Sequence, residues 1–113
     1  MQKRPEDIAM YDDLVDNLLK VQGLDLYRII LYGSTARGDN EPDSDIDIAI
    51  IVTSALNETE EDELSDRIVD LNLKYEKVFS VIDINLDHYE NWKNVIPFYK
   101  NVDNEGIVLW QAA

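Results

Sequence analysis

At 113 residues with 45% apolar composition, the chain suits one globular domain and is too short for two domains of ordinary size. Its 24 acidic and 10 basic residues give a net charge of −14, which disfavours direct binding of nucleic acid and favours metal cations or a basic protein partner. The sequence has no cysteine for a disulfide or a thiolate metal site, and no apolar run near the roughly 18 residues of a membrane span.

The first third of the chain predicts a helix followed by a strand. Met1–Asp7 has a basic pair with no apolar stretch behind it, unlike a signal peptide, so we expect a cytoplasmic protein. Pro5–Gln22 spaces its apolar residues three and four apart, as an amphipathic helix does, and Gly23 suits the position just past its end. Leu26–Tyr32 is an apolar run of strand length, and the polar stretch Gly33–Ser44 predicts a loop.

The middle of the chain predicts a strand, a helix and a second strand. Ile46–Val52 alternates at first and is then continuously apolar, which indicates a buried strand. Asn57 followed by Glu60 matches a capping box, so we expect a helix that begins there and continues to Tyr75. Val78–Leu86 is a further β-rich apolar run and predicts a strand.

The C-terminal part predicts two short helices and a last strand. Asp87 is a candidate cap for a helix that contains Trp92, and Pro97 is expected to open a helix that Gly106 closes. Ile107–Trp110 is expected to form the strand. Because strands and helices are interleaved, we predict a single α/β domain over residues 1–113, with a mixed sheet of about four strands flanked by helices on one side.

Two acidic residues at the start of a strand are the first candidate for chemistry. Side chains alternate along a strand, so Asp45 and Asp47 should project to the same side and repel each other. A bound divalent cation relieves that repulsion, and carboxylate oxygens suit magnesium or manganese better than zinc. The alternative is an exposed strand edge whose charges oppose aggregation.

Asp83 is the third candidate ligand, because it interrupts an otherwise apolar strand. A carboxylate in such a position is costly unless it is paired or metal-bound. If its strand lies beside the strand of Asp45 and Asp47, the three carboxylates can converge. Two magnesium ions ~4 Å apart would then brace the attacking and leaving oxygens of a phosphoryl displacement. Asp83 would ligate one ion and accept the acceptor's proton.

Gly33 and Ser34 stand where the first strand ends, and they are candidates for holding phosphate. A glycine lets the backbone approach a ligand closely, and the following N–H groups and the Ser34 hydroxyl can contact phosphate oxygens. The alternative is an ordinary turn. A P-loop is rejected because Asp39 stands where that motif needs lysine. Arg37 is a candidate phosphate partner or one more surface base.

The same residues resemble a known signature. Glycine-serine, ten residues, then aspartate-any-aspartate is the pattern of the DNA polymerase beta-like nucleotidyltransferase superfamily. The loop Gly33–Gly38 and the segment Ser44–Ile48 look like its minimal nucleotidyltransferase (MNT) domain. The tail, from Pro97–Tyr99 to Glu105–Trp110, also resembles that family's ending, so the likeness extends over nearly the whole chain.

The resemblance implies ATP as donor and magnesium as cofactor, with Ser34 as the phosphate-gripping serine. It implies Asp45, Asp47 and Asp83 as the metal-binding acids. It also implies an antitoxin that adenylylates a tyrosine of a HEPN-domain ribonuclease toxin. Two alternatives stay open: an MNT fold that silences a toxin by binding alone, and a transferase acting on small molecules such as aminoglycosides. The short chain favours a protein acceptor, because the larger small-molecule transferases add a helical domain that shapes the acceptor pocket.

Overall fold

The computed structural model describes residues 5–113. The basic pair within Met1–Arg4, on which the signal-peptide argument rests, lies outside the described residues. In chain order the elements are α1 (Pro5–Leu19), β1 (Leu26–Tyr32), α2 (Gly33–Arg37), β2 (Ile46–Val52), α3 (Glu58–Tyr75), β3 (Phe79–Asn85), α4 (Leu86–Trp92), α5 (Pro97–Glu105) and β4 (Ile107–Gln111). None of the helices described is long and apolar enough to cross a membrane.

The four strands form one mixed sheet in the order β3-β2-β1-β4. The central strand β1 pairs antiparallel with both β2 and β4, whereas β2 and β3 run parallel. Strand β2 is the most deeply buried, because six of its seven positions are buried and the unbroken run from Ile48 to Val52 takes in both faces of the strand. The predicted neighbourhood of the second and third strands is therefore confirmed, and their parallel register fixes which side chains face each other.

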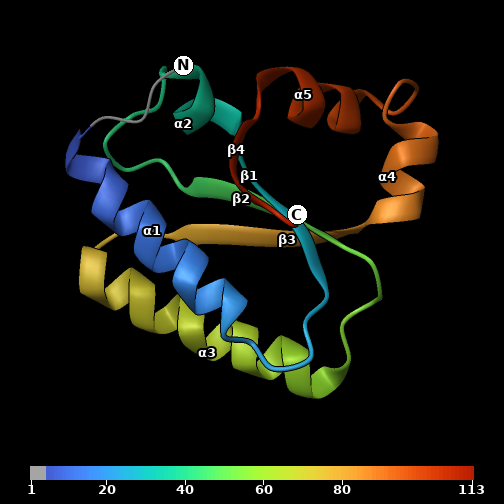
Figure 1. Cartoon of the computed structure of the whole chain (residues 1–113). Helices are drawn as coiled ribbons and strands as arrows, with labels where there is room; N and C mark the ends of the chain where they lie inside the picture. Colours follow the sequence, from blue (N-terminus) through green and yellow to red (C-terminus); the bar gives the residue numbers. More distant parts are fainter. Residues whose placement is uncertain (1–4) are drawn as a thin grey trace.

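Helices cover both faces of the sheet, whereas the sequence predicted cover on one side only. The α/β class and the four-stranded mixed sheet are confirmed. One core joins α1 and α3 to alternate residues of β2, including Ile48 and Ile50. A second core joins α4 and α5 to the intervening residues Ala49 and Ile51 through the fully buried Tyr89. Figure 1 shows the two helical layers on either side of the strands. The physical reason is that a strand apolar on both faces must be covered on both.

Several element boundaries differ from those predicted. The first helix ends at Leu19 and not at Gln22, because the Val21 N–H donates to the Leu18 carbonyl three residues back, and not to the carbonyl four residues back as in an α-helix. The polar stretch predicted as a loop begins with the short helix α2. Helix α4 is capped by Asn85, whose side-chain oxygen accepts from the His88 N–H, and not by Asp87. Strand β3 is one residue shorter at each end than expected.

Helix α3 begins with the predicted capping box. The Asn57 side-chain oxygen accepts from the Glu60 N–H at 2.8 Å, and the Glu60 carboxylate accepts from the Asn57 N–H at 2.9 Å. The helix that follows lies against α1 over the first core. The capping box therefore fixes where this layer of the fold starts, because it satisfies N–H groups that have no partner within the helix.

Replacing Asn57 with Ala should lower the free energy of unfolding by about 1 kcal/mol, because one N–H of the first turn loses its acceptor. Urea denaturation followed by circular dichroism measures the change. The exposed neighbour Thr59, replaced with Ala, serves as the control and should change little. Equal losses in the two variants would contradict a specific role for the cap.

Candidate active site

The site is built where β1 ends against the beginning of β2. In the antiparallel register Tyr32 lies opposite Asp47, and Gly33 follows directly with φ of 77°. A Cβ atom placed on Gly33 would collide with Oδ2 of Asp47. The position therefore requires glycine on two grounds, the left-handed backbone and the closeness of the carboxylate. This close approach brings the start of α2 directly over Asp47.

Asp45 and Asp47 remain close to each other, as the sequence predicted. Asp47 is half-buried, and Asp45 precedes the strand at an exposed position. Burial raises the pKa of Asp47, and the negative charge of Asp45 raises it further, while Arg37 opposes both effects. Burial also raises the pKa of the neighbouring Tyr32 hydroxyl, and the negative charge of Asp47 raises it further. The pair thus concentrates negative charge at this end of the sheet, which Arg37 offsets only in part, because the pKa of Asp47 stays raised.

Asp83 does not join the pair, and the predicted convergence of three acids is wrong. In the parallel register Asp47 lies beside Ser80, whereas Asp83 lies beside Ile50, three residues further along. Ile50 belongs to the core under α1 and α3, so Asp83 lies on that face, where it is exposed. Neighbouring strands were inferred correctly, but the alternation of side chains places Asp83 on the opposite face from Asp47.

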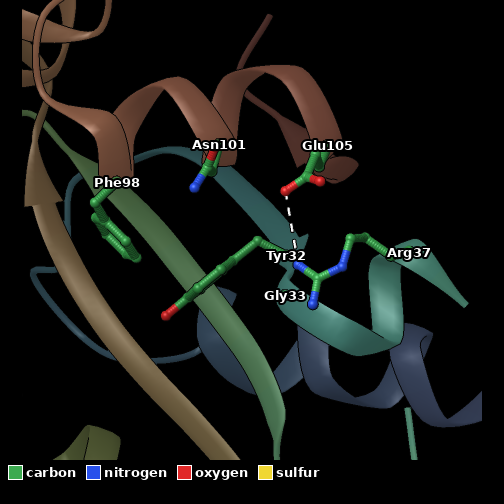
Figure 2. A pocket seen from close by; sticks show the side chains of 6 residues that line it. All are labelled: Tyr32, Gly33, Arg37, Phe98, Asn101 and Glu105. Carbon is green, nitrogen blue, oxygen red and sulfur yellow. Dashed lines mark ion pairs between the residues drawn. The ribbon is translucent and has the colours of Figure 1, made fainter. Parts of the chain in front are cut away.

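Arg37 closes a cavity between α2 and α5. The cavity has a volume of about 180 Å³ and is lined by Tyr32, Gly33, Arg37, Phe98, Asn101 and Glu105. Figure 2 shows that these side chains come from the end of β1, from α2 and from α5, with the Arg37 guanidinium turned toward Glu105. Arg37 forms ion pairs with Asp39 at 3.3 Å and with Glu105 at 3.6 Å. Both predicted roles of Arg37 thus stay compatible with its place, since it lines the cavity and also pairs with surface acids.

Ser34 is the second residue of α2 and is partly buried. Its carbonyl oxygen accepts from the N–H groups of Gly38 and Asp39, at 2.9 and 3.1 Å, which closes the short helix. The hydroxyl of the following residue, Thr35, is buried and has no hydrogen-bond partner among the described residues. Ser34 therefore stands on a folded turn beside Gly33, next to the acid pair, and not in an extended loop.

The cavity residues contributed by α5 were missed as site residues. Phe98 and Tyr32 pack edge to face, with ring centroids 5.5 Å apart, and Asn101 lies on the same helix between Phe98 and Glu105. The sequence carries a signal for them, because the resemblance to the family includes Pro97–Tyr99 and Glu105–Trp110. What it lacked was the placement of α5 next to α2, which the fold supplies.

The donor set suits a magnesium ion held by two carboxylates. Asp45 and Asp47 offer hard oxygen ligands close enough for one charge to affect the other, and magnesium is commonly bound by one or two carboxylates together with substrate phosphates. Within residues 5–113, no group of three or more histidine, cysteine, aspartate or glutamate residues is arranged to hold a metal. The residues present therefore fit the ion, but with fewer acids than the sequence predicted.

Most of the chain matches a single protein family. The sequence profile described as "Polymerase beta, Nucleotidyltransferase" matches residues 15–112. The chain belongs to this family. It is also 39% identical over 83 residues to a Methanocaldococcus jannaschii protein provisionally named a protein adenylyltransferase, a match that covers 74% of this chain and 77% of the relative. The resemblance noted in the sequence is thereby confirmed, and the protein is a nucleotidyltransferase.

The nucleotidyltransferase fold is shared with chains from solved toxin–antitoxin complexes. One complex, crystallised with AMP-PNP, contains a chain that matches with a TM-score of 0.61 and 20% identity, over 90% of this chain and 73% of that one. Another contains a tri-AMPylated Shewanella oneidensis HEPN toxin with an MNT antitoxin, and matches with a TM-score of 0.52 and 18% identity, over 93% of this chain and 73% of that one. At such identities the match shows a shared fold.

Replacing Gly33 with Ala should destabilise the nucleotidyltransferase by roughly 1–2 kcal/mol from the left-handed backbone alone, and by more because the new methyl group meets Asp47. The matched control is Gly38→Ala, which has φ of 83° at the other end of α2 and carries the backbone cost. Thermal denaturation compares the two variants. Equal losses at both glycines would show that the contact with Asp47 adds nothing.

Asp47 should make the stability of the nucleotidyltransferase fall as pH rises. Its folded pKa lies above the ordinary value of 3.8, so between those two values the folded state holds more protons than the unfolded state and loses stability with increasing pH. We expect Asp47→Asn to be more stable than the wild type at pH 7 in EDTA, and this advantage to shrink below about pH 4. Urea denaturation at both pH values measures it.

The control for this prediction is Asp83→Asn, which removes the same charge from an exposed position on the opposite face. This control measures how much stability is gained simply by removing one negative charge from a protein whose net charge is −14. An advantage of the same size in both variants would attribute the effect to net charge and not to the surroundings of Asp47.

Proposed function

We propose that this nucleotidyltransferase transfers AMP from ATP to a tyrosine hydroxyl of a HEPN-type toxin, and acts in the cytoplasm as the antitoxin of that toxin. The observation that carries the proposal is the acid pair Asp45 and Asp47, with Asp47 packed against Gly33, the residue that precedes Ser34. In a member of this family, that arrangement joins a candidate magnesium site to a candidate phosphate site.

Each residue of the site has a proposed task in binding the donor. Asp45 and Asp47 hold magnesium, which when bound supplies positive charge against the departing pyrophosphate. The Ser34 hydroxyl donates a hydrogen bond to a phosphate oxygen, a contact of roughly 0.5–1.5 kcal/mol. Arg37 adds a guanidinium at the cavity wall, where Glu105 and Asp39 hold it in place. These contacts orient the α-phosphorus of ATP for attack.

The transfer itself is a displacement at that phosphorus. The acceptor oxygen forms a bond to the α-phosphorus, the bond from this phosphorus to the bridging oxygen breaks, and pyrophosphate leaves with the electron pair. The hydroxyl proton passes to solvent or to a neighbouring base. A tyrosine hydroxyl has an ordinary pKa of about 10, so its oxygen is a weak nucleophile at neutral pH until that proton is lost.

Three observations support a protein as the acceptor. The relative is named for adenylylation of proteins, and a structural neighbour holds a HEPN toxin that carries AMP groups. The net charge of −14 favours a basic protein over free nucleic acid. Large apolar side chains are also exposed in this part of the chain: Phe98 in the cavity wall, at 40% exposure, and Val95 in the segment that leads into α5, at 62%. Such residues suit contact with a partner.

A second candidate function is supported by the position of Asp83. With two acids at the site where the resemblance implied three, the protein would transfer AMP slowly or not at all, and would silence a toxin by binding alone. The two functions differ in one observable, the covalent AMP on the toxin.

Co-expression with a HEPN-type toxin, taken from the gene next to this one where that gene encodes such a protein, followed by intact mass spectrometry, tests transfer. We expect the toxin to gain ~329 Da for each AMP attached to a hydroxyl, and peptide mapping to place the group on tyrosine. The double variant Asp45→Asn, Asp47→Asn should lose both the adduct and the protection of the host cell, because the magnesium ligands are removed.

The matched control is the double variant Asp62→Asn, Asp66→Asn, which removes the same charge from exposed positions on α3. It should keep both the adduct and the protection. Protection without any adduct, in the wild type and in both variants, would overturn transfer and support silencing by binding alone.

A further inference from the structure

The residue of β3 that faces Asp47 is Ser80. In the parallel register these two residues are direct partners on adjacent strands. They also share a face of the sheet. Residues an even number of positions away on the same strand lie on the same face, and those residues, Ala49 and Ile51 on β2 and Ile84 on β3, belong to the core under α4 and α5. Neighbouring strands lie about 4.8 Å apart, so the partly buried Ser80 side chain stands beside the Asp47 carboxylate.

Asp83 has no route to that position. It lies three residues beyond Ser80, a displacement of roughly 10 Å along the strand, and its side chain is on the other face. A slip of three residues would be needed to bring it to Asp47. Such a slip would also move Phe79 and Val81 out of the core under α1 and α3, where both now pack.

We propose that the metal site of this chain holds one divalent cation through Asp45 and Asp47, and that Ser80 occupies the place where a third carboxylate would bind a second cation. The inference rests on the proposed function in taking the acid pair as magnesium ligands. A serine hydroxyl is neutral, so it can donate a hydrogen bond to Asp47 or contact a cation weakly, but it cannot offset a second double positive charge.

The consequence for the reaction is a missing base beside the acceptor. When AMP is transferred, the acceptor hydroxyl gives up its proton as the bond from its oxygen to phosphorus forms. A carboxylate at position 80 would take that proton directly, whereas Ser80 leaves it to solvent or to the partner. We therefore expect this chain to transfer AMP slowly, at a rate that depends on which groups of the partner can take the proton from the acceptor hydroxyl.

The test counts metal ions and does not depend on an acceptor. Each protein is titrated with Mn²⁺ in a calorimeter in the presence of α,β-methylene-ATP, a nucleotide whose methylene bridge at the reacting phosphorus resists cleavage. The number of Mn²⁺ ions bound by protein and nucleotide together is compared with the number bound by the nucleotide alone. We expect the wild type and Asp83→Asn to add the same single site. Ser80→Asp should add a second site, or tighten the first by about tenfold or more through the added charge.

Two results would overturn the inference. One is a second site in the wild type, and its loss in Asp83→Asn would identify Asp83 as a ligand. The other is a Ser80→Asp variant that matches the wild type in number of sites and in affinity. Ser80→Asn controls for side-chain bulk and should match the wild type, and circular dichroism verifies that each variant is folded.

If Ser80→Asp does not fold, the test is still decisive, because the number of Mn²⁺ sites counted in the wild type and in Asp83→Asn shows whether the chain holds one cation or two. Failure of the proposed function is a distinct result. If no partner acquires AMP but the metal count follows the prediction, the inference stands and transfer to a protein falls.

Discussion

The close approach of Gly33 to Asp47 is the constraint on which the site depends. The pairing of Tyr32 with Asp47 brings the end of β1 to the start of β2, and only a residue without Cβ fits the turn that follows. That turn starts α2, which carries Ser34 beside the acid pair and Arg37 toward α5. One backbone contact therefore places the candidate metal ligands, the candidate phosphate contact and the cavity wall relative to one another.

The helical layer formed by α4 and α5 supplies one wall of the cavity beside Asp47. Tyr89 is fully buried against the sheet and donates to Asp103 on α5 at 3.1 Å, and Val102 completes the same core. This packing holds α5 over the face that carries Asp47, so that Phe98, Asn101 and Glu105 become walls of the cavity. A sheet covered on one side only would leave the acid pair without such a wall.

Much of this was predictable from the sequence, because the relevant signals are local. Strand β2, the capping box at Asn57 and the helix between Pro97 and Gly106 each follow from residues adjacent in the chain. The position of Asp83 was not predictable in this way, because it depends on which residue of β3 pairs with Ile50. The sequence of a strand does not reveal its register against the neighbouring strand. A shift of one residue in that register nevertheless moves every side chain to the other face of the sheet.

The charge distribution around Arg37 bears on the form in which the proposed donor, ATP, would reach the site. Asp39 and Glu105 pair with this guanidinium, and Asp47 interacts with it while lying beside Asp45. Three carboxylates thus interact with one guanidinium, with a fourth beside Asp47, and a bare triphosphate approaching them would meet a field of its own sign. Its cation complex meets much less repulsion. Under the proposed function, the protein would therefore discriminate against the uncomplexed nucleotide, and the free cation concentration would control how much donor it binds.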